Sequence, residues 1–302
     1  MRVLFVGSKQ QGLQALRAVH AAVGDRLVGF VTIDDRDDGR SVCDELLGAA
    51  AVSGIPGVVA TSRRDSEARI SEFQPDLVVV VGWYWLLSSE LLRLPRLGFV
   101  GVHNSLLPTY RGSSPLVWAL IRGDEQVGCS LFGFADRMDA GPIWAQRSMY
   151  VGQHDYVGDV LARLEEATGE MLRSTLPGIL DGTAIPSIQD EAGATYCAPR
   201  APEDGEIDWQ RANADIHRFV RAQSSPYPGA FTSASSKKLT VWRARPATEP
   251  FLGTPGQVVA HPDGWTGIAC GDGTALILES VELDGQTFDP RQLRRVARRV
   301  GG

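Results

Sequence analysis

Residues 98–112 read GFVGVHNSLLPTYRG, and this stretch is the best guide in the sequence to the fold and to the position of the reactive side chains. The apolar run over residues 99–102 predicts a strand that ends at His103, and a loop punctuated by proline and glycine follows. A second strand-like run, residues 129–134, leads to Asp139. A histidine at a strand end can stand beside a binding loop, and a nearby carboxylate can orient its imidazole. We therefore predict that His103 and Asp139 form the catalytic pair.

The region before this stretch alternates between two kinds of pattern. Compact apolar runs, typical of strands buried on both faces, occupy residues 2–7, 27–33, 57–60 and 77–81. Segments with helical spacing lie between them, at residues 10–23, 41–53 and 66–73. This alternation predicts an α/β fold with a doubly wound, mostly parallel sheet. A long amphipathic helix over residues 155–180 is expected to close this part.

The length of 302 residues favours two domains. We expect a first domain over residues 1–182, a linker over 183–209 and a second domain over 210–302. The second domain carries short β runs broken by glycine and aspartate, a pattern typical of a small barrel, at residues 238–244, 256–260, 264–270 and 274–283. Five arginines within residues 291–299 predict a basic helical end.

Composition narrows the function classes. A formal net charge of −6 argues against non-specific binding of nucleic acid, which needs a basic face. The four cysteines have no CxxC spacing, so neither a zinc site nor a redox pair is indicated. Residues 7–12 read GSKQQG and not GxGxxG, which disfavours a nicotinamide or flavin site. No apolar stretch predicts a signal peptide or a membrane span, so we expect a cytoplasmic protein with no membrane partner.

The pattern HxSLLPxYRG at residues 103–112, followed by Asp139-Ala140-Gly141, resembles the folate-dependent formyltransferases. A second motif, PEDGEIDW at residues 202–209, is similar to the C-terminal half of the branches that formylate methionyl-tRNA and amino sugars. The resemblance implies a Rossmann-like catalytic domain followed by an OB-like domain. It also implies N10-formyltetrahydrofolate as the formyl donor and no metal. Sugar-modifying relatives are commonly dimers, so a homodimer is one expected state.

Residue roles follow from the same resemblance. His103 and Asp139 are expected to act on the formyl group and its protons. The cofactor-binding residues are expected to be Trp83, Tyr84, Trp85, Leu86, Leu87, Phe134, Arg137 and Met138. The substrate-binding residues are expected to be Ser105, Leu106, Leu107, Pro108, Tyr110 and Arg111. The alternative, without any binding role, is that the aromatic cluster packs in the core and that Arg111 forms an ion pair on the surface.

One position departs from the family pattern. The family reads Asn-x-His, and the Asn position is Gly101 in this chain. Losing one donor to an oxyanion typically costs about 2.7 to 4 kcal/mol. Asn104 follows His103 and is the candidate replacement, although neighbours on a strand point to opposite faces.

We expect formyl transfer to a small-molecule amine, such as a nucleotide-linked amino sugar or a natural-product amine. One alternative is methionyl-tRNA formyltransferase, which the acidic segment over residues 34–38 disfavours because aspartates repel phosphate. The other is a formyltransferase-like protein with altered or lost catalysis that binds folate or a sugar nucleotide. Retention of His103 and Asp139 argues against it, and Gly101 argues for it.

Overall fold

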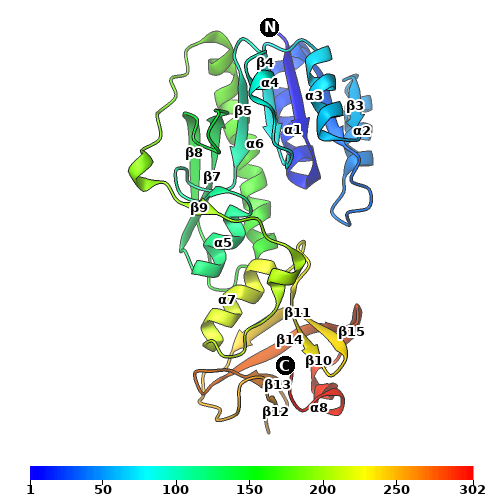
Figure 1. The fold of residues 1–302 in the computed structure, drawn as a ribbon, viewed down its shortest axis with the longest axis vertical. Coiled ribbons are helices and arrows are strands. Elements are labelled where there is room, and N and C mark those ends of the chain that lie inside the picture. The colour runs from blue at the N-terminus through cyan, green and yellow to red at the C-terminus, as the bar shows by residue number, and fades with distance from the viewer. Residues whose placement is uncertain (302) are drawn as a thin grey trace. The chain divides into compact units, whose positions relative to one another are not determined.

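The computed structural model describes residues 1–301, and the chain divides into two compact units, each with its own hydrophobic core (Figure 1). The first unit comprises Met1–Pro115, Gln126–Tyr150 and Leu161–Cys197. The second comprises Leu116–Glu125, Val151–Val160 and the chain from Ala198 onward. No helix within residues 1–301 is both long and apolar enough to cross a membrane.

A seven-stranded sheet forms the centre of the first unit, in the order β3-β2-β1-β4-β5-β7-β8. Its strands are β1 (Val3–Gly7), β2 (Leu27–Ile33), β3 (Gly57–Ala60), β4 (Leu77–Val81), β5 (Phe99–His103), β7 (Gln126–Gly133) and β8 (Ile143–Tyr150). Strands β1 to β5 pair in parallel, whereas β7 and β8 are antiparallel additions at one side. Every residue of β1 and β4 is buried, as their apolar sequences VLFVG and LVVVV require for strands covered on both faces. The predicted fold class is confirmed.

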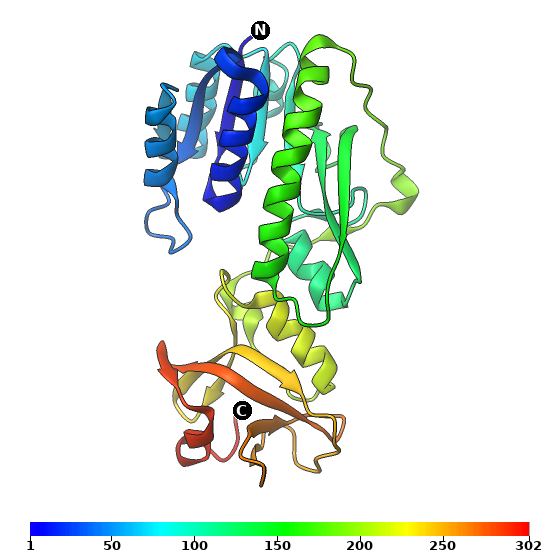
Figure 2. The same ribbon diagram turned by 180° about the vertical axis from the view of Figure 1, so that it is seen from behind.

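Helices cover both faces of this sheet. They are α1 (Lys9–Val23), α2 (Cys43–Val52), α3 (Arg63–Glu72), α4 (Ser89–Leu92) and α6 (Val157–Asp181), whereas α5 (Pro115–Arg122) belongs almost wholly to the second unit. Figure 2 shows α1 and α6 side by side on one face, where Gly169 of α6 lies against Ala18 of α1. A short two-stranded sheet pairs β6 (Arg111–Gly112) with β9 (Tyr196–Cys197). Because the carboxyl ends of parallel strands share one edge, the segments that follow β1, β4 and β5 meet there.

The second unit contains an antiparallel sheet in the order β10-β11-β14-β13-β12, with β15 beside β14. Its elements are α7 (Asn213–Gln223), β10 (Ala230–Ala234), β11 (Lys237–Pro246), β12 (Val258–Ala260), β13 (Thr266–Ala269), β14 (Ala275–Leu283), β15 (Gln286–Phe288) and α8 (Leu293–Val296). The buried faces of these strands and of α7 form one core. This curled β-rich unit agrees with the predicted barrel.

The predicted helix over residues 291–299 is wrong in extent. The α-helix α8 has four residues and ends at Val296. Beyond it the chain is extended, because the Val300 amide donates to the Gly256 carbonyl and the Val258 amide donates to the Arg298 carbonyl. Burial of Val300 in the core fixes this extended path, so the arginines do not share one helix face.

Candidate active site

Strand β5 fixes the position of His103. It lies between β4 and β7, and backbone pairing on both sides holds its last residues. Alternation along the strand places Phe99, Gly101 and His103 on one face. The His103 side chain is 10% exposed, so a mostly buried imidazole keeps a small opening to solvent at the carboxyl edge of the sheet.

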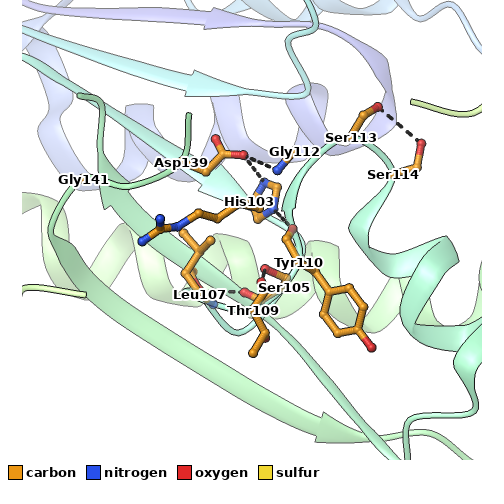
Figure 3. A network of polar contacts seen from close by, with 12 residues as sticks. His103, Ser105, Leu107, Thr109, Tyr110, Gly112, Ser113, Ser114, Asp139 and Gly141 are labelled. Atoms are coloured by element: carbon orange, nitrogen blue, oxygen red, sulfur yellow. Dashed lines mark hydrogen bonds and ion pairs between the residues drawn. The ribbon is translucent and has the colours of Figure 1, made fainter. Parts of the chain in front are cut away.

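Two groups face the nitrogens of the His103 imidazole (Figure 3). Nε2 lies 2.7 Å from the Tyr110 carbonyl oxygen, and because a carbonyl accepts only, Nε2 carries a proton and donates it. Nδ1 lies 3.8 Å from Asp139 Oδ2, which is longer than a hydrogen bond. The two side chains predicted as a pair are therefore close together. The contact that orients the ring, however, comes from the backbone of Tyr110.

Asp139 stands in a turn between β7 and β8, and its backbone has φ 50° in the left-handed region. Its Oδ2 accepts a hydrogen bond of 2.7 Å from the Gly112 amide. Within residues 1–301 its other carboxylate oxygen has no hydrogen-bond partner. The Gly112 bond holds one oxygen in place and leaves the other available to a ligand proton.

Asn104, the candidate substitute for the family's asparagine, is engaged elsewhere. Its Oδ1 accepts from Gln11 Nε2 at 2.8 Å, and its Nδ2 donates to Gln11 Oε1 at 3.2 Å. Gln11 belongs to α1, so the pair ties the residue after β5 to the helix on the face of the sheet seen in Figure 2. The role predicted for Asn104 at the reacting centre stays a prediction.

The space beside Gly101 is filled by Phe134. A Cβ added to Gly101 would overlap the Phe134 ring and lie 3.2 Å from the Val80 carbonyl oxygen. Phe134 in turn stacks on Phe132 and Phe99, with ring centroids 5.3 and 6.2 Å away. Gly101 thus lies against packed aromatic rings, and an asparagine at this position could enter only if the Phe134 ring moved.

Most of the predicted cofactor residues follow β4. Trp83, Trp85 and Leu87 are partly buried and pack on the same core cluster as Phe134. Trp83 and Trp85 meet edge to face, with centroids 5.5 Å apart. These four side chains, from two segments well separated in sequence, therefore contribute to one apolar region beside β5.

The other predicted cofactor residues reach solvent. Tyr84 and Leu86 are exposed and alternate with the packed residues of the same segment. Met138 is exposed as well. Arg137 is 66% exposed and its guanidinium lies 2.8 Å from Glu191.

The loop predicted to bind substrate is held largely by its own side chains. Ser105 is buried and its hydroxyl donates to the Thr109 carbonyl at 2.6 Å. Leu107 is buried against Phe132 and Ile143. Leu106 and Pro108 are partly buried beside them. The structure thus gives Ser105 and Leu107 roles in shaping the loop that carries Tyr110.

Arg111 is neither a surface pair nor a solvent-facing group, because its side chain has 0% exposure. Its guanidinium donates to Gln189 Oε1 at 2.8 Å and to Glu191 Oε1 at 2.9 Å. It also donates to the Tyr196 hydroxyl. The Arg111 contact lowers the pKa of Glu191. The sequence analysis did not identify Gln189 and Glu191, because neither belongs to a motif. The available signal was Arg111 itself, an arginine within a motif that has no acidic residue nearby in the sequence.

The acidic segment over residues 34–38 is largely paired within the protein. Arg36 contacts Asp34 and Asp44, each at 2.8 Å. Lys9 contacts Asp35 and Asp38. The segment remains net acidic, but its repulsion of phosphate is weaker than its sequence indicates.

Two further groups in the first unit have shifted pKa values. Burial raises the pKa of the Cys129 thiol to about 11, so it stays protonated near neutral pH and is a poor nucleophile. Burial, with Asp35 and Asp38 nearby, raises the pKa of Tyr84 to about 12. Neither the Cys129 thiol nor the Tyr84 hydroxyl is therefore suited to proton transfer near neutral pH.

The chain combines a doubly wound α/β unit, which carries a histidine and a carboxylate at the carboxyl edge of its sheet, with a separate β-rich unit. Residues 31–176 match the sequence model of the formyl transferase domain. Residues 200–297 match that of the formyl transferase C-terminal domain. The chain therefore belongs to the formyl transferase family.

Solved structures share this fold. HypX from Aquifex aeolicus, in complex with tetrahydrofolic acid, is 20% identical with a TM-score of 0.65, and the match covers 93% of this chain but 44% of HypX. The N-formyltransferase from Helicobacter canadensis, in complex with folinic acid and dTDP-3-aminofucose, is 15% identical with a TM-score of 0.66. The match covers 95% of this chain and 100% of the Helicobacter chain. Methionyl-tRNA formyltransferase from Clostridium thermocellum is 18% identical with a TM-score of 0.56, and the match covers 89% of this chain and 99% of the Clostridium chain. At these identities the likeness concerns the fold.

Proposed function

We propose that this protein transfers a formyl group from N10-formyltetrahydrofolate to the amine of a small-molecule acceptor. The single observation that carries the proposal is the placement of the His103 and Asp139 side chains 3.8 Å apart at the carboxyl edge of the sheet. In a chain of the formyl transferase family, this is where open α/β sheets bind their ligands.

The residues present fit a folate. Trp83, Trp85, Leu87 and Phe134 offer apolar side chains from one cluster, which suits a flat pterin. The Trp83 indole N–H is buried and has no hydrogen-bond partner in the part of the chain that the structure describes. A polar ring edge would satisfy this donor. The folate ligands of the HypX and Helicobacter canadensis structures support the same assignment for this chain. When bound, the folate supplies the formyl group, and the chemistry needs no metal.

The contacts of His103 and Asp139 suggest how they share the work. The acceptor amine loses a proton as its new C–N bond forms, and the leaving nitrogen gains one. The Tyr110 carbonyl keeps the proton on His103 Nε2, so Nδ1 is the nitrogen that faces Asp139. Nδ1 and the carboxylate together can take up the first proton and return the second. Once the imidazole has taken up the first proton, its positive charge can also stabilise the oxyanion that develops on the formyl group, and such stabilisation is usually the largest contribution to rate.

The acceptor class is the finer part of the proposal. A nucleotide-linked amino sugar or a natural-product amine is favoured by the dTDP-3-aminofucose bound to the Helicobacter canadensis enzyme and by the net acidity of residues 34–38. The competing acceptor, initiator tRNA, is favoured by the five arginines within residues 291–299. In the small-molecule case the protein needs no nucleic-acid or membrane partner.

Altered catalysis is the second candidate, because Phe134 occupies the space that a side chain at Gly101 would need. On that reading the chain binds folate or a sugar nucleotide and transfers formyl slowly or not at all. Folate binding and turnover must therefore be measured separately.

The test combines both measurements. Thermal shift with folinic acid reports binding to the folded state, and incubation with N10-formyltetrahydrofolate and a panel of nucleotide-linked amino sugars reports formylated product by mass spectrometry. We expect stabilisation by folinic acid and product from one acceptor class. A gel shift with initiator tRNA over a salt series tests the tRNA alternative, since phosphate contacts weaken steeply with salt. Stabilisation without any product would favour altered catalysis, and the absence of both would refute the proposal.

A further inference from the structure

The segment over residues 187–197 returns to the candidate active site although it lies between the two family matches, which cover residues 31–176 and 200–297. The Ser187 backbone exchanges two hydrogen bonds of 2.8 Å with Ile143 at the start of β8. Further on, β9 pairs with β6, which carries Arg111 and Gly112. The segment therefore runs from the Asp139 side of the site to the Tyr110 side.

Gln189 is the residue of this segment that touches the Asp139 turn. Its Nε2 donates to the carbonyl oxygens of Asp139 and Gly141, both at 2.7 Å. Its Oε1 accepts from Arg111 Nε at 3.2 Å and from Arg111 Nη2 at 2.8 Å. Gln189 is 6% exposed, so both ends of its amide are satisfied by the protein and held away from water.

The contacts of Gln189 join the two loops that face His103. On one side is the turn of Asp139, and on the other is the loop of Tyr110 and Arg111. Tyr110 and Asp139 have φ 59° and 50°, a conformation that side-chain-bearing residues adopt only when the surroundings hold it. Thr195, from the same segment, contacts the second loop, since its hydroxyl accepts from the Tyr110 amide at 2.8 Å.

We propose that Gln189 is a positioning residue for formyl transfer, acting through the Asp139 turn on the carboxylate that faces His103 Nδ1. The proposal rests on the proposed function. A glutamine suits this task because its amide donates at one end and accepts at the other, so it can bridge two carbonyls and a guanidinium. The buried Arg111 is in turn the fixed support of the Gln189 carbonyl.

Two substitutions separate positioning from simple structural support. Gln189→Glu keeps an acceptor for Arg111 but places a carboxylate against the Asp139 and Gly141 carbonyls, so the two donated bonds are lost. Gln189→Leu removes the donors and the acceptor without adding a charge, and it carries the same test if Gln189→Glu does not fold. The matched control is Ile188→Ser, because Ile188 precedes Gln189 in the same segment and is 85% exposed to solvent.

The readouts are steady-state kinetics and NMR of protein labelled with ¹⁵N-histidine. The chain has five histidines, and a His103→Gln variant identifies the His103 signals. We expect Gln189→Glu to lower kcat roughly 10- to 100-fold with little change in KM for donor and acceptor, because a small misplacement of a reacting group costs rate and not binding. We also expect it to shift the His103 signals, with Ile188→Ser unchanged in both.

The proposal would be overturned if Gln189→Glu had the kcat and the His103 signals of the wild-type protein. A lowered melting temperature in that variant would not rescue it, because loss of stability alone indicates a merely structural role. If the wild-type protein formylates none of the acceptors, the proposed function fails, and the His103 signals alone decide whether Gln189 controls the imidazole environment.

Discussion

His103 and His217 lie in different units of this protein and in opposite electrostatic surroundings. His103 has the Tyr110 carbonyl oxygen at Nε2 and the Asp139 carboxylate near Nδ1, so both ring nitrogens face oxygen atoms that act as hydrogen-bond acceptors. His217, on α7, is partly buried, and this burial together with the nearby Arg221 and His154 lowers its pKa to about 4. Partial burial is common to both. The difference teaches that the surroundings give two histidines different roles: His103 faces two groups that can accept its protons, whereas burial and nearby cations disfavour a charge on His217.

The strongest test of this contrast exchanges each histidine for glutamine. His103→Gln should lower kcat by roughly 10²- to 10⁴-fold, the usual contribution of a general acid–base group. His217→Gln should leave kcat near the wild-type value. Formylation kinetics on both variants provide the measurement, with melting curves to verify folding. Equal losses in the two variants would break the distinction.

Replacing the carboxylate that faces His103 is expected to have the next largest effect. Asp139→Asn keeps an oxygen that can accept from the Gly112 amide, but it removes the negative charge opposite Nδ1. We expect kcat to fall about 100-fold, within the range for one proton-transfer group, while the melting temperature changes little. Formylation kinetics and thermal melting curves of Asp139→Asn and the wild-type protein measure the two effects. A fully active Asp139→Asn enzyme would show that Tyr110 alone prepares the imidazole.

A smaller effect is expected at Gly101, on the same face of β5 as His103. Gly101→Asn forces the Phe134 ring to move, so it should lower the free energy of unfolding by about 1–3 kcal/mol, the usual cost of overpacking. Gly101→Ala is the matched control because it introduces the same Cβ without the amide. Urea unfolding measures both.

The cause can be checked by placing each substitution in a Phe134→Ala background. If the ring is what the new Cβ meets, Gly101→Asn should cost less there than in the wild-type background, since residues in contact give non-additive effects. Additive costs would assign the destabilisation to another neighbour. The rate of the Gly101→Asn/Phe134→Ala variant then shows whether an asparagine at this position accelerates formyl transfer.

The smallest effect concerns acid stability in the second unit. The folded-state pKa of His217, about 4, lies below its ordinary value of 6.5, so the unfolded chain takes up this proton first as the pH falls. The stability that His217 contributes is therefore present above about pH 6.5 and is lost between pH 6.5 and 4. His217→Gln should flatten the melting temperature of the protein over that range, compared with wild type. An identical pH profile in the variant would contradict the lowered pKa.

Much of the fold could be predicted from local sequence patterns. The buried runs at β1 and β4 and the helical spacing of α1 each specify their element from neighbouring residues, and all three elements form where they were predicted. The residues after Val296 were harder, because a basic, helix-compatible segment is pulled into an extended path by the burial of Val300. Burial against a distant core outweighed local helix preference there.

The candidate site was predictable in part for the same reason. A motif marks His103 and Asp139, but nothing local shows that the Tyr110 carbonyl orients the ring or that Phe134 fills the space beside Gly101. Arg111 is buried and hydrogen-bonded to Gln189 and Glu191, and its predicted contact with substrate stays a prediction. Gln189 carries no chemical signature in the sequence, and its partner Asp139 is 50 positions away.

The sequence by itself determined the α/β class, the second β-rich part and the identity of the histidine and aspartate, because residue type and short-range periodicity encode these. Only the tertiary structure decided which groups surround the imidazole and which segment holds the two loops in place. The physical reason is that hydrogen bonds of a fixed length join backbone and side-chain atoms from positions far apart in the chain, and their geometry exists only once the sheet has formed.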